Sequence, residues 1–373
     1  MPSSADRQAE RFLARALALA ARGRYRTSPN PRVGAVLVRD GEIVGSGWHR
    51  QVGGPHAEVA ALAEAGERAR GATLYVTLEP CAHFGRTPPC ADALLAAGVR
   101  RVVACHRDPD PRVSGRGFER LRTAGVEVEV GLLAARAALL NVPFLVAATL
   151  GRPAVTLKWA MSLDGRIATA GGESQWISGR AGRRWALALR EEHDATLAGV
   201  GTVLADDPLL NRRLGLAGRP GTRVVMDRRL RTPLEARLFT AADPVVLYTE
   251  SRDPERRRAL EARGAAVVVL PAVEPQAVLA DLFGRGLQSV LVEGGGEALA
   301  SFVASGLYDR IAADCAPLLI GGRTAPGPLG GEGSSALAAA PRLENLTAHR
   351  RGGDVVLTAY REGYLAETLA RIL

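Results

Sequence analysis

Cysteine, aromatic residues and long apolar runs are all scarce in this chain. Its four cysteines, in a sequence without the apolar core of a secretory signal, argue against a disulfide framework and favour thiolates that bind a metal. No uninterrupted apolar stretch approaches the length of a membrane span. These absences predict a soluble, cytoplasmic protein that crosses no membrane.

Lysine is almost absent: Lys158 is the only lysine among 48 Lys and Arg residues. The formal net charge of +9 would suit a nucleic-acid partner, but the basic residues are scattered and aromatics make up only 5% of the chain, too little for base-stacking surfaces. We therefore expect small phosphorylated ligands and no nucleic acid. A single lysine among so many arginines is either a chance survivor or a residue that supplies a compact charge or a proton.

The length of 373 residues predicts two domains, each with its own core. Hydrophobic spacing predicts a helix over residues 7–22, then strands, with helices between the later ones, at 33–38, 43–47, 73–78, 101–105 and 126–130. A second series follows a boundary near 150–153, with strands at 154–160, 195–199, 223–227, 244–249, 265–270, 289–293, 310–315 and 354–360, and a long surface loop at 321–340. This alternation predicts layered α/β domains over residues 1–147 and 152–373.

The most informative motif lies in the first half. His56-Ala-Glu58 is followed by Cys81 and Cys90, each of which comes directly after a proline. One imidazole and two thiolates can hold zinc and leave a fourth position open for water, which is typical of a catalytic site. Glu58 is not a ligand but can carry protons, the division of labour in zinc-dependent base deaminases. We expect His56 and Cys90 at helix starts, whose partial positive charge favours a thiolate.

Eight residues separate Cys81 from Cys90, whereas the common deaminase signature has two. The longer loop, which contains His-Phe-Gly-Arg-Thr-Pro-Pro, resembles the deaminase half of the bifunctional riboflavin-biosynthesis deaminase-reductases. This resemblance implies a cytidine-deaminase-like three-layer α/β/α domain. The substrate contacts that it implies are Asn30, His49, Arg86 and Asp108. Asp110 replaces an asparagine of the family's Asp-Pro-Asn-Pro loop, so an amide donor is lost.

A glycine turn marks the second half. The predicted strand at 289–293 runs into three glycines and then a helix pattern. Backbone amides in such a turn can bind a phosphate, although three glycines are more common in tight turns and do not match the Rossmann fingerprint. The Glu-Gly-Gly-Gly sequence resembles the pyridine-nucleotide loop of reductases with the dihydrofolate-reductase-like α/β fold. Residues 157–165, 172–178 and 202–208 resemble the riboflavin-pathway reductase domain.

The resemblance implies binding roles in this second domain. The implied NADPH contacts are Met161, Trp176, Thr202, Asp206, Arg228, Gly295, Gly296, Glu297, Ala298, Leu299, Ala300 and Ser301. The implied contacts to the phosphorylated sugar are Ser174, Arg190, Leu210, Arg213 and Glu293. Lys158 stands where the family keeps a lysine, and we assign it a catalytic role, whereas Arg228 stands where many relatives carry serine. Surface charge for the two substrate arginines, and a core position for Trp176, are the alternative interpretations.

We therefore predict a bifunctional enzyme of riboflavin synthesis, a zinc hydrolase and an NADP-dependent oxidoreductase, that forms a homo-oligomer. Deamination of a diaminopyrimidinone ribosylamino phosphate, with Glu58 moving protons, would precede NADPH-dependent reduction of the ribosyl chain to a ribityl chain. The alternative is a tRNA-adenosine or nucleobase deaminase whose C-terminal half is a non-catalytic binding module. That alternative explains the metal motif but leaves more than half of the chain without a role.

Overall fold

A five-stranded sheet, in the order β2-β1-β3-β4-β5, organises the first part of this computed structural model, which describes residues 4–82, 89–110 and 113–373. Its strands are β1 (Gly34–Arg39), β2 (Glu42–Trp48), β3 (Thr73–Val76), β4 (Arg101–Ala104) and β5 (Glu127–Val130). β1 is antiparallel to β2 and β3, whereas β3, β4 and β5 are parallel. The chain therefore leaves β3 and β4 at the same edge of the sheet, where open α/β sheets bind ligands.

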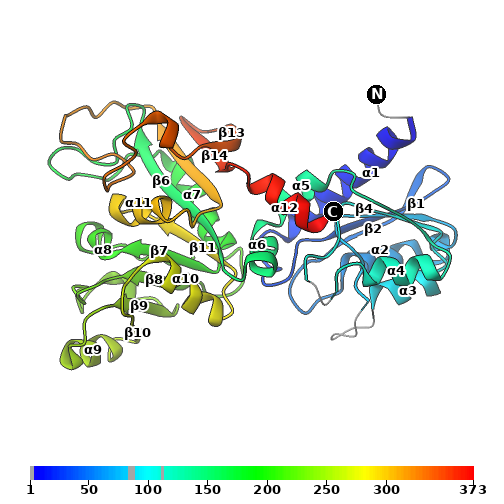
Figure 1. Cartoon of the computed structure of the whole chain (residues 1–373), viewed down its shortest axis with the longest axis horizontal. Helices are drawn as coiled ribbons and strands as arrows, with labels where there is room; N and C mark the ends of the chain where they lie inside the picture. The colour runs from blue at the N-terminus through cyan, green and yellow to red at the C-terminus, as the bar shows by residue number, and fades with distance from the viewer. Residues whose placement is uncertain (1–3, 83–88, 111–112) are drawn as a thin grey trace. The chain divides into compact units, whose positions relative to one another are not determined.

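Helices cover both faces of this sheet (Figure 1). They are α1 (Ser4–Ala20) and α5 (Ala134–Leu140) on one face, and α2 (Ala57–Ala65), α3 (Cys90–Ala96) and α4 (Arg116–Thr123) on the other. Leu13 of α1 packs in the same core cluster as Val36, while the next strand residue, Leu37, packs with Leu94 of α3. Successive residues of a strand point to opposite faces, so β1 contributes to both cores. The predicted three-layer α/β/α domain is confirmed.

A nine-stranded sheet, in the order β10-β9-β8-β7-β11-β6-β12-β14-β13, organises the second part. Seven strands are parallel from β10 to β12, and β14 and β13 extend the sheet antiparallel. The strands are β6 (Ala154–Ser162), β7 (Ala195–Gly199), β8 (Thr222–Met226), β9 (Val245–Thr249), β10 (Ala265–Val269), β11 (Ser289–Glu293), β12 (Arg310–Ala316), β13 (Leu343–Arg351) and β14 (Asp354–Arg361). β13 has no counterpart among the predicted strands, because nearly all of this edge strand is exposed and it carries no buried apolar pattern.

The helices of the second part again cover both faces. They are α7 (Arg180–Glu192), α8 (Val200–Asp206), α9 (Pro254–Glu261), α10 (Pro275–Gly284) and α11 (Gly296–Ala304). Val292 of β11 packs in one core cluster with Leu299 of α11, whereas the adjacent Leu291 packs with Leu189 of α7 on the opposite face. The predicted second α/β domain is confirmed. Residues 321–340 are a loop apart from the short 3-10 turn at Leu337–Ala339.

The last helix returns to the first part of the chain. The two compact units comprise residues 1–151 with 365–373, and residues 152–364. The second domain predicted from the sequence included residues 365–373, which contain most of α12 (Tyr364–Ile372). In the structure Ile372 is fully buried with Ala138 and Leu145, beside α5 and α6 (Val142–Leu150) (Figure 1). An amphipathic segment indicates that one face is buried, but not which surface buries it.

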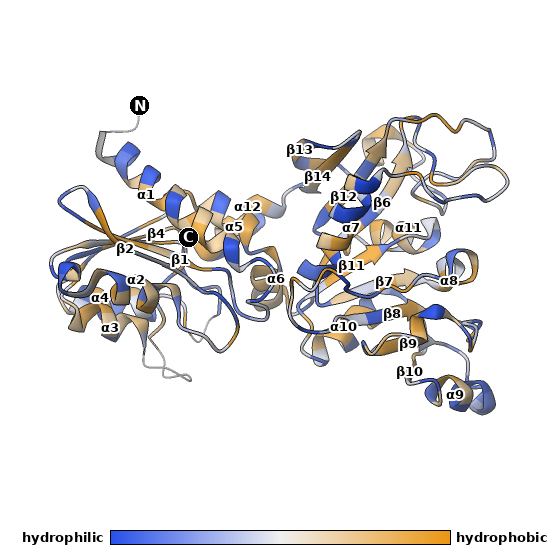
Figure 2. Ribbon diagram, turned by 180° about the vertical axis from the view of Figure 1, so that it is seen from behind, coloured by the Kyte–Doolittle hydropathy of each residue, from blue (hydrophilic) through white to orange (hydrophobic). Residues whose placement is uncertain are grey.

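Hydropathy separates strands from exposed helices along the chain. β9 and β10 consist mostly of apolar residues, whereas the solvent-facing α9 consists largely of charged ones (Figure 2). The strands therefore contribute to the core on which the polar helices lie. None of the helices in the described part of the chain combines the length and the apolar character needed to cross a bilayer.

Candidate active sites

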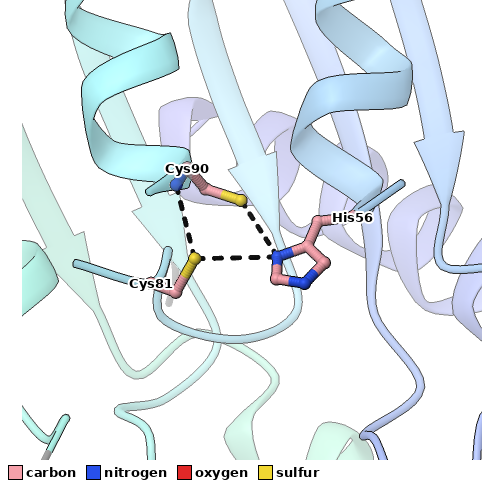
Figure 3. Close-up of side chains that lie close together, drawn as sticks. All are labelled: His56, Cys81 and Cys90. Atoms are coloured by element: carbon pink, nitrogen blue, oxygen red, sulfur yellow. Dashed lines mark hydrogen bonds between the residues drawn. The ribbon is translucent and has the colours of Figure 1, made fainter. Parts of the chain in front are cut away.

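Three metal-ligand side chains from separate segments of the first unit converge (Figure 3). His56 Nδ1 lies 3.1 Å from Cys90 Sγ and 3.6 Å from Cys81 Sγ, and the backbone N–H of Cys90 donates to Cys81 Sγ at 3.3 Å. Tetrahedral zinc, bonded at about 2.0 Å to nitrogen and about 2.3 Å to sulfur, separates its donors by roughly 3.5 Å, so this set fits zinc. In the described ranges it is the only group of three or more His, Cys, Asp or Glu donors that all lie within 4.8 Å of one another.

The elements that carry these ligands explain why they meet. His56 immediately precedes α2 and Cys90 begins α3, while Cys81 lies on the loop after β3. α2 packs directly on β2, since a Cβ added at Gly47 would lie only 2.4 Å from the Ala57 carbonyl oxygen. The absence of a side chain at this position therefore lets the start of α2 approach the sheet and places His56 beside the two sulfur atoms.

The ionisable side chains at the metal-ligand set have shifted pKa values. Burial raises the pKa of Glu58, which is 4% exposed, to about 7. The hydrogen bond between His56 and Cys81 raises the pKa of His56. Hydrogen bonds from Cys90 and His56 lower the pKa of Cys81 to about 4. The pKa of Cys90 is raised, chiefly by its hydrogen bond to Cys81. Glu58 can therefore hold a proton near neutral pH, and one thiolate is already available to a cation.

A pocket of about 320 Å³ opens beside these groups, and a hydrogen-bonded pair fixes part of its wall. His49 Nδ1 lies 3.0 Å from the Pro55 carbonyl oxygen, which can only accept, so Nδ1 carries the hydrogen and Nε2 accepts from Asn30 Nδ2 at 3.2 Å. Burial lowers the pKa of His49, which favours this neutral form. The pair therefore sets the orientation of the Asn30 amide in the pocket.

Most of the predicted substrate contacts of the first domain share this pocket. Asn30, His49 and Asp108 line it, while Arg86 lies outside the described residues. Asp110 also lines it, so the carboxylate that replaces the family's amide faces the same space. Val113 and Phe144 add apolar walls that sequence analysis missed, because a hydrophobic residue in a loop or helix gives no signal that it faces a ligand.

The second unit contains a buried cluster of two cations around one carboxylate. The Arg190 guanidinium donates to both carboxylate oxygens of Glu293, at 2.7 and 2.8 Å, and Lys158 Nζ lies 3.8 Å from Glu293 Oε2. The parallel pairing of β11 with β6 places Glu293 opposite Lys158. Burial alone would raise the pKa of Glu293, but Arg190 and Lys158 outweigh it and hold that pKa at about 2. The cluster therefore keeps one excess positive charge, and Arg190 is not a solvated surface residue.

The other predicted residues of the second unit differ in their burial and contacts. Ser174 Oγ donates to Asp206 Oδ1 at 2.7 Å. Trp176 is 69% exposed, with the Arg183 guanidinium 4.8 Å from its ring centroid, so it is not part of the core. Arg213 is exposed. Desolvation and the positive charge of Arg190 both lower the pKa of Arg213. The predicted contacts Leu210, which is buried, and Met161, which is partly buried in β6, complete the set.

A cavity of about 1070 Å³ lies along α11, and the Gly294–Gly296 turn at the start of this helix is not among the residues that line it. Gly295 has φ 72°, and a Cβ there would lie 2.9 Å from Thr202 Oγ1, so glycine is required for this approach. The predicted residues that line the cavity are Arg228, Glu297, Ala298, Ala300 and Ser301. Leu299 packs in the core instead, so only its main chain is available to a ligand. Arg229 and Arg231, which sequence analysis missed, line the cavity as well.

The fold and the metal-ligand set define a class of protein: an α/β/α domain with a zinc site of the deaminase kind, joined to a second α/β domain. Residues 6–106 match the family model for the cytidine and deoxycytidylate deaminase zinc-binding region. Residues 153–357 match the model for the RibD C-terminal domain. Each model therefore falls on one of the two units.

Curated relatives and solved structures match almost the whole chain. The riboflavin biosynthesis protein RibD of Escherichia coli is 43% identical over 369 residues, 94% of this chain and 98% of the relative, and that of Aquifex aeolicus is 43% identical over 86% and 90%. The structure of Acinetobacter baumannii RibD, form 1, is 39% identical and covers 95% of this chain and 99% of that one, with a TM-score of 0.85. A Thermotoga maritima structure, described as a diaminohydroxyphosphoribosylaminopyrimidine deaminase and 5-amino-6-(5-phosphoribosylamino)uracil reductase, is 35% identical over 96% and 99%, with a TM-score of 0.84.

The chain belongs to the RibD family of riboflavin biosynthesis proteins. It is accordingly a two-domain enzyme, a deaminase followed by a reductase, whose domains imply zinc and NADPH as cofactors and small phosphorylated pyrimidines as substrates. The match over residues 153–357 gives the second half a reductase identity. It thereby removes the reason for treating that half as a non-catalytic module.

Proposed function

We propose that this chain catalyses two successive steps: hydrolytic deamination of a diaminopyrimidinone ribosylamino phosphate, then NADPH-dependent reduction of the ribosyl chain of the product. The observation that carries the first step is the buried Glu58 carboxyl beside the converged His56, Cys81 and Cys90, in the wall of a pocket. A proton carrier beside a metal site with three protein ligands is the arrangement of base deaminases.

In the deaminase pocket, Glu58 moves protons while Asn30 and His49 orient the pyrimidine. Zinc held by the three ligands supplies Lewis acidity that lowers the pKa of water. Glu58 takes a proton from the water and passes it to the leaving amine, and the burial-raised pKa of Glu58 suits both transfers. The water oxygen adds to the ring carbon, the second water proton goes to the adjacent ring nitrogen, and the carbon–nitrogen bond to the amine then breaks, so the products are a ring carbonyl and ammonia.

In the reductase domain, the cluster around Glu293 supports binding of the phosphorylated sugar. NADPH supplies hydride to C1 of the ring-opened ribose. The reduced product also needs one proton, and the Lys158 side chain in this cluster can donate one, which arginine does far less readily. The hydrogen bond from Ser174 to Asp206 is assigned to positioning of the sugar and the cofactor.

We assign the cavity beside α11 to the cofactor. The start of α11 carries backbone N–H groups of the kind that bind phosphate, and residues of this helix line the same cavity as the three arginines. Arg228 forms an ion pair with Glu250, whose carboxylate oxygen lies 3.5 Å from Arg228 Nε. Arg229 and Arg231 are therefore the stronger anion-binding groups. An arginine near the adenosine ribose accommodates the 2′-phosphate that distinguishes NADP from NAD.

The test is a coupled assay on the purified protein with the diaminopyrimidinone ribosylamino phosphate, following ammonia release and NADPH absorbance together, with and without a zinc chelator. Ammonia release followed by NADPH oxidation, both halted by chelation, is the expected result. Ammonia without NADPH oxidation would contradict the second step, and neither signal would contradict both. A cytoplasmic location, a homo-oligomeric state and the absence of a nucleic-acid partner stay predictions, which fractionation, light scattering and RNA-binding measurements test.

A further inference from the structure

Glu79 is a buried carboxylate on the loop after β3, two residues before the Cys81 ligand. We propose that Glu79 is a positioning residue for deamination, which holds the loop that carries Asp108, Asp110 and Val113 against the metal-ligand loop and thereby sets the affinity for the pyrimidine. This role rests on the deaminase function proposed above. Glu79 is itself one of the residues that line the pocket. In the proposed role it neither coordinates metal nor moves protons, and it acts by holding the wall of the pocket in place.

The side chain of Glu79 accepts four backbone hydrogen bonds. Oε1 accepts from the N–H of Gly117 at 2.8 Å and of Phe118 at 3.3 Å. Oε2 accepts from the N–H of Gly115 at 2.9 Å and of Asp108 at 3.1 Å. Four acceptor positions are the full capacity of a carboxylate, and a side-chain amide offers only half of them, because its nitrogen is a donor. No neutral residue of the same size can therefore hold these four groups.

Two of these donors are N–H groups in the first turn of a helix. Gly117 and Phe118 follow Arg116, the first residue of α4, where backbone N–H groups lack partners within the helix. A negative charge at this end is also favourable to the helix dipole. Glu79 therefore caps α4 from a distant part of the chain, and fixes where the loop before α4 ends.

The loop and the ligand segment are in direct contact at Gly117. A Cβ added there would lie 1.9 Å from the carbonyl oxygen of Pro80, the residue between Glu79 and Cys81. No side chain fits in that space, so the backbone of α4 lies on the backbone of the metal-ligand loop. The two segments can be separated only by breaking the hydrogen bonds of Glu79.

Hydrogen bonds connect Asp108 to two other residues of the pocket wall. Asp108, Asp110 and Val113 all line the pocket that contains Glu58. The N–H of Asp110 donates to Asp108 Oδ1 at 2.9 Å, and the N–H of Val113 donates to the Asp110 carbonyl oxygen at 2.8 Å. A shift of the Asp108 backbone therefore moves both of the other residues in the wall of this pocket.

The test is Glu79→Gln, assayed for deamination and for zinc content. We expect KM to rise by about tenfold or more, because two charge-assisted hydrogen bonds are lost from the wall, while kcat stays within about threefold and zinc remains bound. Glu119→Gln is the matched control, since Glu119 is an exposed residue of the same α4. It should leave KM unchanged.

Three results would overturn the proposal. An E79Q variant whose KM, kcat and zinc content all equal those of the wild type would show that the wall is held by other groups. Loss of zinc with an unchanged KM would make Glu79 a support for Cys81 alone, and an unchanged KM with a lower kcat would place it in the chemistry. Ammonia release by the wild type keeps these results distinct from failure of the proposed function, which would appear as a wild type without activity.

A second measurement applies if E79Q does not fold. In the wild type, the N–H groups of Gly115, Gly117 and Phe118 should exchange slowly with deuterium, because each is bonded to a buried carboxylate. Binding of the uracil-type product should slow them further. Exchange as fast as that of an exposed loop, or no response to the product, would contradict a wall that Glu79 holds for the substrate.

Discussion

Arg190 and Glu293 form a two-point ion pair in the second unit, with N–O distances of 2.7 and 2.8 Å between largely buried side chains. Lys158 lies 3.8 Å from the same carboxylate. Removing one member of such a group leaves a buried charge without its partner, which costs stability. The same three residues are predicted to act on the sugar substrate, so folding and binding depend on one charge cluster.

The acid stability of the second unit should depend on Glu293. The pKa of Glu293 falls from an ordinary 4.5 to about 2 in the folded chain, so its ionised form stabilises the fold above about pH 4.5, and this stabilisation is lost as the pH falls through 2. We expect Glu293→Gln to lower the free energy of unfolding by roughly 3 kcal/mol at neutral pH, and by progressively less toward pH 2. Urea unfolding over this pH range measures both. A difference that does not change with pH would contradict the assignment.

Glu58→Gln should abolish most of the deamination while leaving zinc bound. Glutamine cannot carry a proton, and general acid and base catalysis contributes about 10²–10⁴-fold, so kcat should fall by that factor. Ammonia release and metal analysis measure the two effects. Glu64→Gln, an exposed residue of the same α2, is the control and should change neither. Loss of zinc from E58Q would instead make Glu58 a structural support for the ligands.

Lys158→Ala and Lys158→Arg should both lower the reductase kcat, by at least about tenfold, and leave ammonia release unchanged. Arginine keeps the charge near Glu293 but does not readily give up a proton, so it should restore stability more than turnover. NADPH oxidation with the deaminated substrate measures the effect. Full turnover in either variant would remove Lys158 from the chemistry.

Arg229 and Arg231 should select the phosphorylated nucleotide. Replacing both by alanine should weaken binding of 2′,5′-ADP by about tenfold or more, since charge-assisted hydrogen bonds to phosphate are lost, and should leave 5′-ADP binding little changed. Calorimetry with these two probes needs no turnover. Arg257→Ala, an exposed arginine of α9 outside the cavity, is the control. Equal losses for both nucleotides would show a general field and not a 2′-phosphate site.

The C-terminal helix should stabilise the deaminase unit and not the reductase unit. Ile372 is fully buried with Ala138 and Leu145, and the Arg107 N–H donates to the Ile372 carbonyl oxygen at 3.0 Å. Ile372→Ala should cost roughly 2–4 kcal/mol and lower the temperature at which deamination is lost. The neighbouring Leu373→Ala, at a half-exposed position, should cost much less. Equal inactivation of both activities by I372A would contradict this assignment of the helix.

The sequence by itself determined the metal-ligand set and the two-domain α/β organisation. Zinc ligands are few residue types, so His56, Cys81 and Cys90 are recognisable from their chemistry and their order in the chain. The glycine turn at Gly294–Gly296 can be recognised from the sequence in the same way, because a loop without side chains between a strand and a helix is a local feature. Strand and helix alternation follows from hydrophobic period, which is also local.

Only the tertiary structure decided which distant residues meet. Glu79 carries no local mark of its four hydrogen bonds, because its donors lie 29 to 39 positions later in the chain. Arg229 and Arg231 are two among many arginines until the fold places them in one cavity. The burial of Ile372 in the first unit could not be read from its helix either, since an apolar face specifies that a helix is buried but not where. Composition and period are properties of neighbours in sequence, whereas these contacts depend on the path of the whole chain.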